Sequence, residues 1–252
     1  MQKKRFLTLS LGLVGILVLI SLYSCNKNNT SPTPPPLDIN EDIDGNHYDT
    51  VRIGKQLWMV QPLKVTRYND GTPIPYVVNG NTWAATTTGA RCYYGTNVGG
   101  TTVSTSDSAK YAATYGALYN WAAVHSGKLA PKGWHIADTS EWNTLIGTLN
   151  KNPNFTGGND PKVGGMLKET GTTHWTAPND GADNSSGFKA LPAGYRNSIG
   201  SFINLGNSAF FWSSTESTSA NAFCQYLNSS NAGVIRKGDD KLLGFSVVCV
   251  SN

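Results

Sequence analysis

Charged residues are scarce in this 252-residue sequence, which has 20 Lys and Arg against 16 Asp and Glu. Three of the basic residues lie within the first five positions, so the rest of the chain carries 17 positive and 16 negative groups. The remaining Lys and Arg are scattered along the chain. Because binding to phosphates requires a concentrated basic face, we expect no nucleic-acid partner.

Residues that build the common catalytic templates are also few. The sequence has four Glu, and its four His lie at no spacing that places two of them on one face of a helix or strand. It lacks a Gly-x-Ser-x-Gly nucleophile elbow, a phosphate-binding glycine loop and a dinucleotide-binding fingerprint. A paired-carboxylate hydrolase would have to use Asp residues that lie in turn-like contexts. The sequence therefore indicates no catalytic residue and no cofactor other than the calcium ion considered below.

The N-terminus has the pattern of a bacterial lipoprotein signal peptide, which we place at residues 1–24. A basic head, MQKKR, precedes an apolar run over residues 6–22, as in a secretion signal. Residues 22–25, Leu-Tyr-Ser-Cys, resemble the lipobox, in which the cysteine is acylated. We expect lipidation of Cys25 and attachment to the membrane through this lipid. An uncleaved anchor or free secretion is the alternative, because the apolar run is nearly long enough to span a bilayer.

The segment after the cysteine has almost nothing to bury. Residues 26–37 read NKNNTSPTPPPL, and such polar and Pro-rich sequences are extended and solvated. We predict a lipidated cysteine and Pro-rich tether over residues 25–40, followed by one domain over residues 41–252. The acidic residues that often mark surface export are absent after Cys25. We expect an outer-membrane lipoprotein that faces either the cell surface or the periplasm.

Two alternating apolar runs within residues 50–59, TVRIGKQLWM, flank a Gly-Lys pair and predict a β-hairpin with a tight turn. We expect Val51 and Ile53 to meet Leu57 and Met59 on one face of this hairpin.

Two helices are predicted farther along the chain. The first spans residues 108–127, where apolar residues recur at helical spacing. The second begins at Asp138, which can form a capping box with Glu141, and its apolar stripe is expected to face the core. The residues that carry these patterns are Tyr115, Leu118, Tyr119 and Ala122 in the first helix and Trp142, Leu145, Ile146 and Leu149 in the second.

Short β-like runs follow from Phe188 onward, among them FFWSS, AFCQYL, AGVIRK and GFSVVCV. The order of a hairpin, two helices and several strands predicts an α+β fold with short, mostly antiparallel strands and long loops.

Seven blocks of the chain resemble, in order, the motifs of the Fibrobacter succinogenes major paralogous domain family. They are DIDGNHYDTVRIGKQLWM, YGALYNWAAV, PKGWHIADTSEWNTL, VGGMLKETGTTHW, GADNSSGFKALPAGYR, FFWSSTE and GFSVVCV, within residues 42–251. The family occurs in lipoproteins and surface proteins. The resemblance implies the fold shared by C-type lectins and formylglycine-generating enzymes, and it implies no particular activity.

The cysteines depart from the pattern of the family. Members often have a cysteine where this chain has Ala130, and that cysteine commonly pairs with the one on the closing strand. Cys249 is left to pair with Cys92 or Cys224, or to stay free. We expect a Cys224–Cys249 disulfide, because both lie on C-terminal runs and an exported chain meets an oxidising compartment.

The alternative for Cys224 and Cys249 is a catalytic pair, as in formylglycine-generating enzymes. The Arg-Gly-Gly-Ser context of those cysteines is absent, as is the His-x-x-x-His-x-Glu motif of the related sulfoxide synthases. A structural disulfide therefore explains the two cysteines with fewer assumptions.

Calcium and aromatic side chains provide the remaining binding hypotheses. The sugar-site tripeptides of calcium-dependent lectins are absent, but Asp180, Asp183 and Asn184 concentrate oxygen ligands and are a candidate calcium site. Side chains that bond their own turns are the alternative. Trp83 and Trp175 lie in polar, loop-like surroundings and are candidate contacts to a glycan or a protein. Packing in the core is the alternative, particularly for Trp175.

The sequence thus favours a lipid-anchored, non-catalytic binding or adhesion domain with a glycan or protein ligand. The alternative is an oxidising enzyme that uses Cys224 and Cys249. The sequence indicates no oligomeric state.

Overall fold

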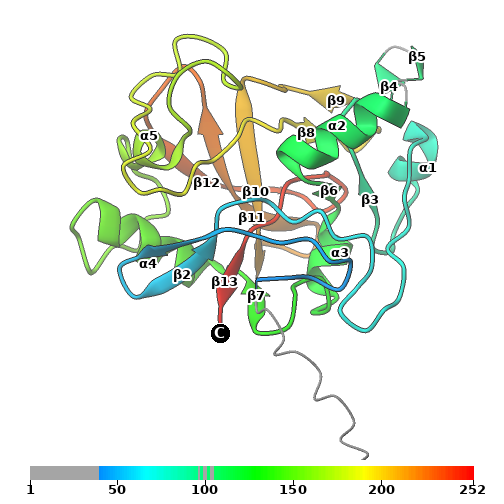
Figure 1. Cartoon of the computed structure of the whole chain (residues 1–252), viewed down its shortest axis with the longest axis horizontal. Coiled ribbons are helices and arrows are strands. Elements are labelled where there is room, and N and C mark those ends of the chain that lie inside the picture. The colour runs from blue at the N-terminus through cyan, green and yellow to red at the C-terminus, as the bar shows by residue number, and fades with distance from the viewer. Residues whose placement is uncertain (1–39, 96, 99–100, 103–104) are drawn as a thin grey trace, which may run out of the picture. The chain divides into compact units, whose positions relative to one another are not determined.

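The structure is a computed structural model that describes residues 40–95, 97–98, 101–102 and 105–252 (Figure 1). The expected signal peptide, Cys25 and nearly all of the tether lie outside these residues. The described residues belong to one unit, Leu37–Asn252. None of their helices combines the length and apolarity needed to cross a membrane.

The described part of the chain combines five short helices with several antiparallel sheets and is an α+β domain, as predicted. Its helices are α1 (Gly80–Ala84), α2 (Thr105–Tyr115), α3 (Trp121–His125), α4 (Thr139–Leu149) and α5 (Val163–Leu167). Its strands are β1 (Thr50–Ile53), β2 (Gln56–Met59), β3 (Arg91–Cys92), β4 (Asn97–Val98), β5 (Thr101–Thr102), β6 (Leu118–Tyr119), β7 (Trp134–Ile136), β8 (Tyr195–Arg196), β9 (Phe202–Ile203), β10 (Ser208–Glu216), β11 (Asn221–Asn228), β12 (Val234–Asp240) and β13 (Cys249–Ser251).

Seven of these strands form two larger sheets. The larger has the order β1-β2-β13-β7, and the second has the order β10-β11-β12. The pairs β3-β6, β4-β5 and β8-β9 form small ladders beside them. All pairings between named strands are antiparallel, in agreement with the predicted sheet type.

The predicted hairpin is present as β1 and β2, but the predicted facing of its side chains is wrong. Its two-residue turn places Val51 opposite Trp58, and residues directly opposite each other share a face of the ladder. Leu57 and Met59 therefore lie on the other face. Ile53 and Trp58 pack in one core cluster, whereas Met59 packs in another. The hairpin is buried on both faces, because each face contributes to a different cluster.

A single helix over residues 108–127 is also wrong. Helix α2 ends at Tyr115, and Gly116 follows with a φ of +74°. A Cβ at Gly116 would lie 2.7 Å from the carbonyl oxygen of Leu63 and 2.8 Å from that of Pro62. This close approach requires glycine and breaks the helix. The chain then forms β6, which pairs with β3, before the short helix α3 begins.

The predicted helix at Asp138 is confirmed as α4. The Asp138 carboxylate accepts the N–H of Ser140 at 2.7 Å and that of Glu141 at 2.8 Å. Glu141 in turn accepts the N–H of Asp138 at 2.9 Å, which completes the capping box. The apolar stripe packs in the core as expected, with Trp142, Leu145 and Ile146 buried and Leu149 half-buried against them.

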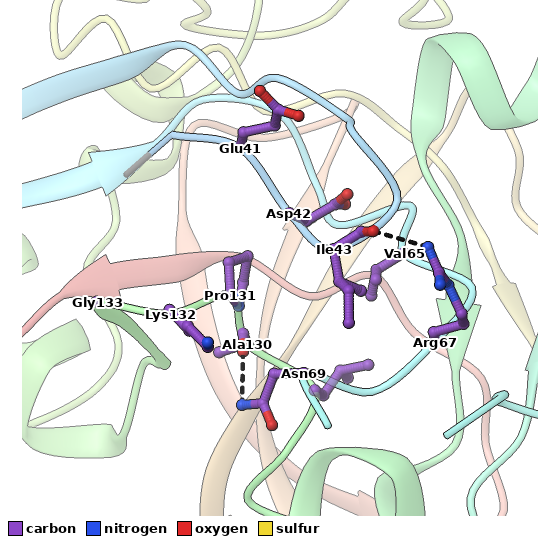
Figure 2. A pocket seen from close by; sticks show the side chains of 11 residues that line it. Glu41, Asp42, Ile43, Val65, Arg67, Asn69, Ala130, Pro131, Lys132 and Gly133 are labelled. Atoms are coloured by element: carbon purple, nitrogen blue, oxygen red, sulfur yellow. Dashed lines mark hydrogen bonds between the residues drawn. The ribbon is translucent and has the colours of Figure 1, made fainter. Parts of the chain in front are cut away.

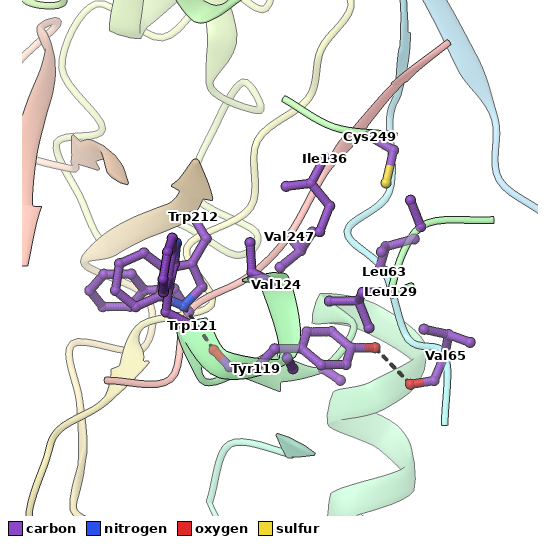
Figure 3. Close-up of a cluster of buried hydrophobic side chains, with 14 of the residues drawn as sticks. Leu63, Val65, Tyr119, Trp121, Val124, Leu129, Ile136, Trp212, Val247 and Cys249 are labelled. Atoms are coloured by element: carbon purple, nitrogen blue, oxygen red, sulfur yellow. Dashed lines mark hydrogen bonds between the residues drawn. The ribbon is translucent and has the colours of Figure 1, made fainter. Parts of the chain in front are cut away.

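The C-terminal segment runs between the two main clusters of the core. Along it, Val247 and Cys249 face one cluster, and Val248 and Val250 face the other. Figure 3 shows the first cluster, in which Val247 lies between Trp212 and Leu63. This alternation is the side-chain pattern of an extended strand that is buried on both faces.

Two buried cations tie loops to the core through backbone carbonyls. The Lys168 ammonium donates to the carbonyls of Asp180, Asn228 and Asn231 at 2.8, 2.9 and 2.9 Å. The Arg196 guanidinium donates to those of Val77, Val78 and Gly200 at 2.5, 2.6 and 3.0 Å. Both side chains have no exposed surface. Each cation thus satisfies three buried backbone carbonyls and joins separate segments of the chain.

We predict that Lys168→Met destabilises the domain by about 3 kcal/mol, because it leaves three buried carbonyls without a donor. Burial lowers the pKa of Lys168 to about 8, with Asp180 acting in the opposite direction, so the ammonium is the main form at neutral pH. Unfolding in urea, followed by tryptophan fluorescence, measures the loss. Lys162→Met, at an exposed position six residues earlier, is the matched control and should change stability by less than about 0.5 kcal/mol. Equal stability of the two variants would contradict the role of Lys168.

Candidate functional site

A cavity of about 340 Å³ opens between the N-terminal loop and the loop that precedes β7 (Figure 2). Its floor is apolar and includes the buried Val65, Leu129 and Ala130. Ile43, which is 39% exposed, forms one edge of the floor. The other lining residues are Glu41, Asp42, Arg67, Asn69, Pro131, Lys132 and Gly133. We call this cavity the pocket.

The N-terminal loop is folded by one carboxylate. Asp42 Oδ1 accepts the N–H groups of Asp44 and Asn46 at 2.9 and 3.0 Å, and Asp42 Oδ2 accepts the hydroxyl of Tyr48 at 2.6 Å. A carboxylate that accepts nearby N–H groups in this way fixes a tight turn. The turn holds Ile43 at the edge of the pocket, where the close-up shows it beside Val65.

Arg67 joins the N-terminal loop to the side of the pocket. Its Nε lies 2.6 Å from Asp44 Oδ1, and its Nη2 donates to the carbonyl of Ile43 at 2.7 Å. Burial raises the pKa of Asp44, but the N–H of Thr66 and the Arg67 guanidinium outweigh it, and the pKa is lowered overall. Asp44 is therefore charged at neutral pH, which favours the ion pair that keeps the edge of the pocket in place.

The opposite wall is held by Asn69, whose Nδ2 donates to the carbonyl of Ala130 at 3.1 Å. At the rim, Glu41 and Lys132 are exposed, and neither takes part in an ion pair among the described residues. The pocket therefore combines an apolar floor with one available negative and one available positive charge.

The candidate ligand contacts Trp83 and Trp175 are packed in the core, as in the alternative reading of the sequence. Each is 1% exposed. The indole N–H of Trp83 donates to the carbonyl of Leu242 at 2.8 Å, and that of Trp175 to the carbonyl of Ala190 at 2.9 Å. Both rings thus have buried partners for their polar and apolar atoms, and neither reaches a ligand at the surface.

Two of the candidate calcium ligands accept hydrogen bonds from backbone N–H groups of the same region of the chain. Asp183 accepts the N–H of Ser185 and Asn184 accepts that of Lys189, both at 2.8 Å. The backbone carbonyl of Asp180 binds the Lys168 ammonium. In the part of the chain that the structure describes, no three His, Cys, Asp or Glu side chains gather into a metal-binding group. The observed hydrogen bonds are those of the turn-forming alternative.

The expected Cys224–Cys249 disulfide is wrong, since Cys92, Cys224 and Cys249 are all free and buried. Cys224 lies on β11 and Cys249 on β13, which belong to different sheets. The thiol of Cys224 instead donates to Asp239 Oδ2 at 3.2 Å. Burial raises the pKa of both thiols well above the ordinary value, so they are protonated at neutral pH.

We predict that these thiols react with iodoacetamide at least about 100-fold more slowly in the native protein than in urea, because they are buried and protonated. Burial also raises the pKa of Cys92 to about 11. In a Cys25→Ser chain, mass spectrometry measures the labelling of the three cysteines of the domain alone. Detection of a Cys224–Cys249 bond without reduction, or rapid labelling of either residue, would contradict this prediction.

The pocket residues come from three separate loops, so no periodicity in the sequence marks them. The one usable feature is Ile43 between Asp42 and Asp44, an apolar residue inside a polar turn. Such a residue has no partner on its own segment and can be recognised as part of a site only when the facing loop is known.

Fold and site together define an α+β domain with a buried aromatic core and an apolar surface pocket between loops. Residues 51–251 match the Fibrobacter succinogenes major domain, and the chain belongs to this family. No curated protein and no solved structure matches the chain. The name of the family specifies no activity, so the function has to be argued from the residues.

Proposed function

We propose that this chain is a lipid-anchored protein of the bacterial envelope whose domain binds a ligand without catalysing a reaction. The observation that carries the proposal is the pocket, with its apolar floor and its available charges at Glu41 and Lys132. Its volume of about 340 Å³ lies in the range of ligand pockets. Ligand pockets are typically apolar with a few polar groups that fix orientation, which is the composition found here.

The chemistry of the pocket favours a peptide segment of a protein partner. An apolar side chain would fill the floor beside Ile43 and Val65, and flanking charges would pair with Glu41 and Lys132 at the rim. An apolar anchor with a polar rim is the usual anatomy of a protein interface. The lining of the pocket has no aromatic ring on which the apolar face of a sugar could pack.

The frame we propose for the pocket is the C-type lectin-like fold shared with formylglycine-generating enzymes. The family blocks in the sequence and the mixture of short helices with antiparallel sheets support it. In proteins generally, the loops vary in sequence more than the core elements that they connect, and binding residues are concentrated on loops.

The oxidising enzyme is the less favoured alternative. A catalytic thiol requires access to substrate and a lowered pKa. Cys224 and Cys249 have neither property, because both are fully buried and burial raises the pKa of each. Asp239, which accepts from Cys224, also opposes formation of the thiolate.

We predict that Ile43→Asp weakens binding at the pocket by about tenfold or more, because it places a charge at the edge of an apolar floor. Peptides selected from a random library on the purified chain should share an apolar residue flanked by charges. Their dissociation constants are then measured by calorimetry. Ile235→Asp is the matched control, since Ile235 is 38% exposed and lies outside the pocket, on β12. The proposal fails if no peptide is selected, or if selected peptides bind Ile43→Asp as tightly as the parent chain.

Anchoring depends on Cys25, which we propose to be acylated and held at the outer membrane by its lipid. Cys25→Ser should abolish incorporation of labelled palmitate and release the chain from the membrane fraction.

Adhesion further requires a surface-facing domain, so proteinase added to intact cells should remove the domain. If the proteinase removes the domain only after the cells are lysed, the domain faces the periplasm. The protein would then be a periplasm-facing binding protein and not an adhesin.

A further inference from the structure

A row of aromatic side chains lies around α2, outside the pocket. The ring centroids of Tyr94 and Tyr111 are 5.9 Å apart, and those of Tyr111 and Tyr115 are 5.8 Å apart. His174 continues the series, with its ring 5.8 Å from that of Tyr115. We call these four residues the tyrosine row. They share no residue with the pocket.

Local structure explains how the row is built. Tyr111 and Tyr115 are four residues apart on α2 and therefore lie on the same face of the helix. Tyr94 comes from the loop after β3, where its hydroxyl accepts the N–H of Leu205 at 3.3 Å. The ring of Tyr94 also packs on Phe202, at a centroid distance of 5.1 Å.

The rings of the row are held by the domain yet remain accessible. Tyr94 and Tyr115 pack against a small buried cluster that includes Trp83, Leu118 and Phe202. All four members of the row are nevertheless partly exposed, in contrast to the seven tryptophans, which are all buried. Rings that are fixed before binding lose little conformational entropy when a ligand arrives.

At the His174 end of the row, the side chains can form hydrogen bonds and their charges offset one another. His174 Nδ1 lies 2.6 Å from Glu169 Oε2, and Lys189 Nζ lies 3.8 Å from Glu169 Oε1. Burial raises the pKa of Tyr94 and Tyr115, so their hydroxyls stay neutral. The negative charge of the Glu169 carboxylate is offset by the Lys189 ammonium. The row therefore offers partly exposed aromatic rings, hydroxyls and an imidazole, without a field that attracts a charged polymer.

We infer that the tyrosine row binds a neutral polysaccharide. The faces of sugar rings carry apolar C–H groups that pack on aromatic rings, and their hydroxyls bond with phenols, imidazole and carboxylate. A series of rings at similar spacing suits an extended polymer, because successive sugars can contact successive side chains. A protein partner would be expected to bind one central anchor residue that becomes fully desolvated. In the row, no single residue stands out in this way, because all four members are partly exposed.

The test uses the purified full chain and a panel of neutral polysaccharides, namely cellulose, mixed-linkage glucan, mannan and starch, with polygalacturonate as the charged comparison. Affinity electrophoresis should show binding of the parent chain to at least one neutral polymer and weaker or no binding to polygalacturonate. Tyr111→Ala and Tyr115→Ala should each weaken that binding by about tenfold. Tyr111→Phe keeps the ring and should retain most of the affinity.

Two controls separate this site from loss of fold and from the pocket. Thermal unfolding identifies any variant that is misfolded, and Tyr226→Ala removes a partly buried tyrosine that lies outside the row, on β11. Ile43→Asp tests whether a chain with an altered pocket still binds the polymer, which keeps a failure of the two proposals distinguishable. The inference is overturned if the parent chain binds no neutral polymer, if it binds polygalacturonate as tightly, or if the folded double variant of Tyr111 and Tyr115 binds as well as the parent.

Discussion

Pairing of the C-terminal segment, residues 244–251, with distant parts of the chain is the constraint on which the rest of the domain depends. Gly244 bridges to Arg196, Phe245 to Tyr119 and Ser246 to Phe211, and Val250 lies between Trp58 and His135. These partners come from the hairpin, the middle of the chain and both sheets. Since each pairing joins residues far apart in sequence, the last residues of the chain complete the core.

Both proposed binding sites rest on this centre. The carbonyl of Val247 accepts the N–H of Leu63 at 2.8 Å, and the carbonyl of Val65 accepts the hydroxyl of Tyr119 at 2.7 Å (Figure 3). The floor of the pocket is thus the outer side of a packed core cluster. Gly116, which packs against the carbonyl of Leu63, ends α2 and so sets the position of the tyrosine row.

Local interactions were predictable from the sequence, and tertiary ones were not. The capping box at Asp138 involves residues three apart, so its pattern is complete within one turn of helix. The break at Gly116 depends on the backbone of residues 62–63, which no helical periodicity reveals. Trp83 has polar neighbours in sequence, yet its indole N–H is satisfied by a carbonyl 159 residues away. The pocket was missed for the same reason, because its walls meet only after the loops have been placed by the core.

The loop with the candidate calcium ligands also contributes a backbone carbonyl to a site in which a protein side chain occupies a position suited to a cation. Hard cations bind to backbone carbonyls and carboxylates, and here the Lys168 ammonium lies among carbonyls of Asp180, Asn228 and Asn231. An ammonium has three donors, which matches the three acceptors. A divalent cation at the same carbonyls would have to displace Lys168 or be repelled by its charge. The geometry of this loop is therefore set in part by a covalently attached cation, which links the segment after α5 to the end of β11.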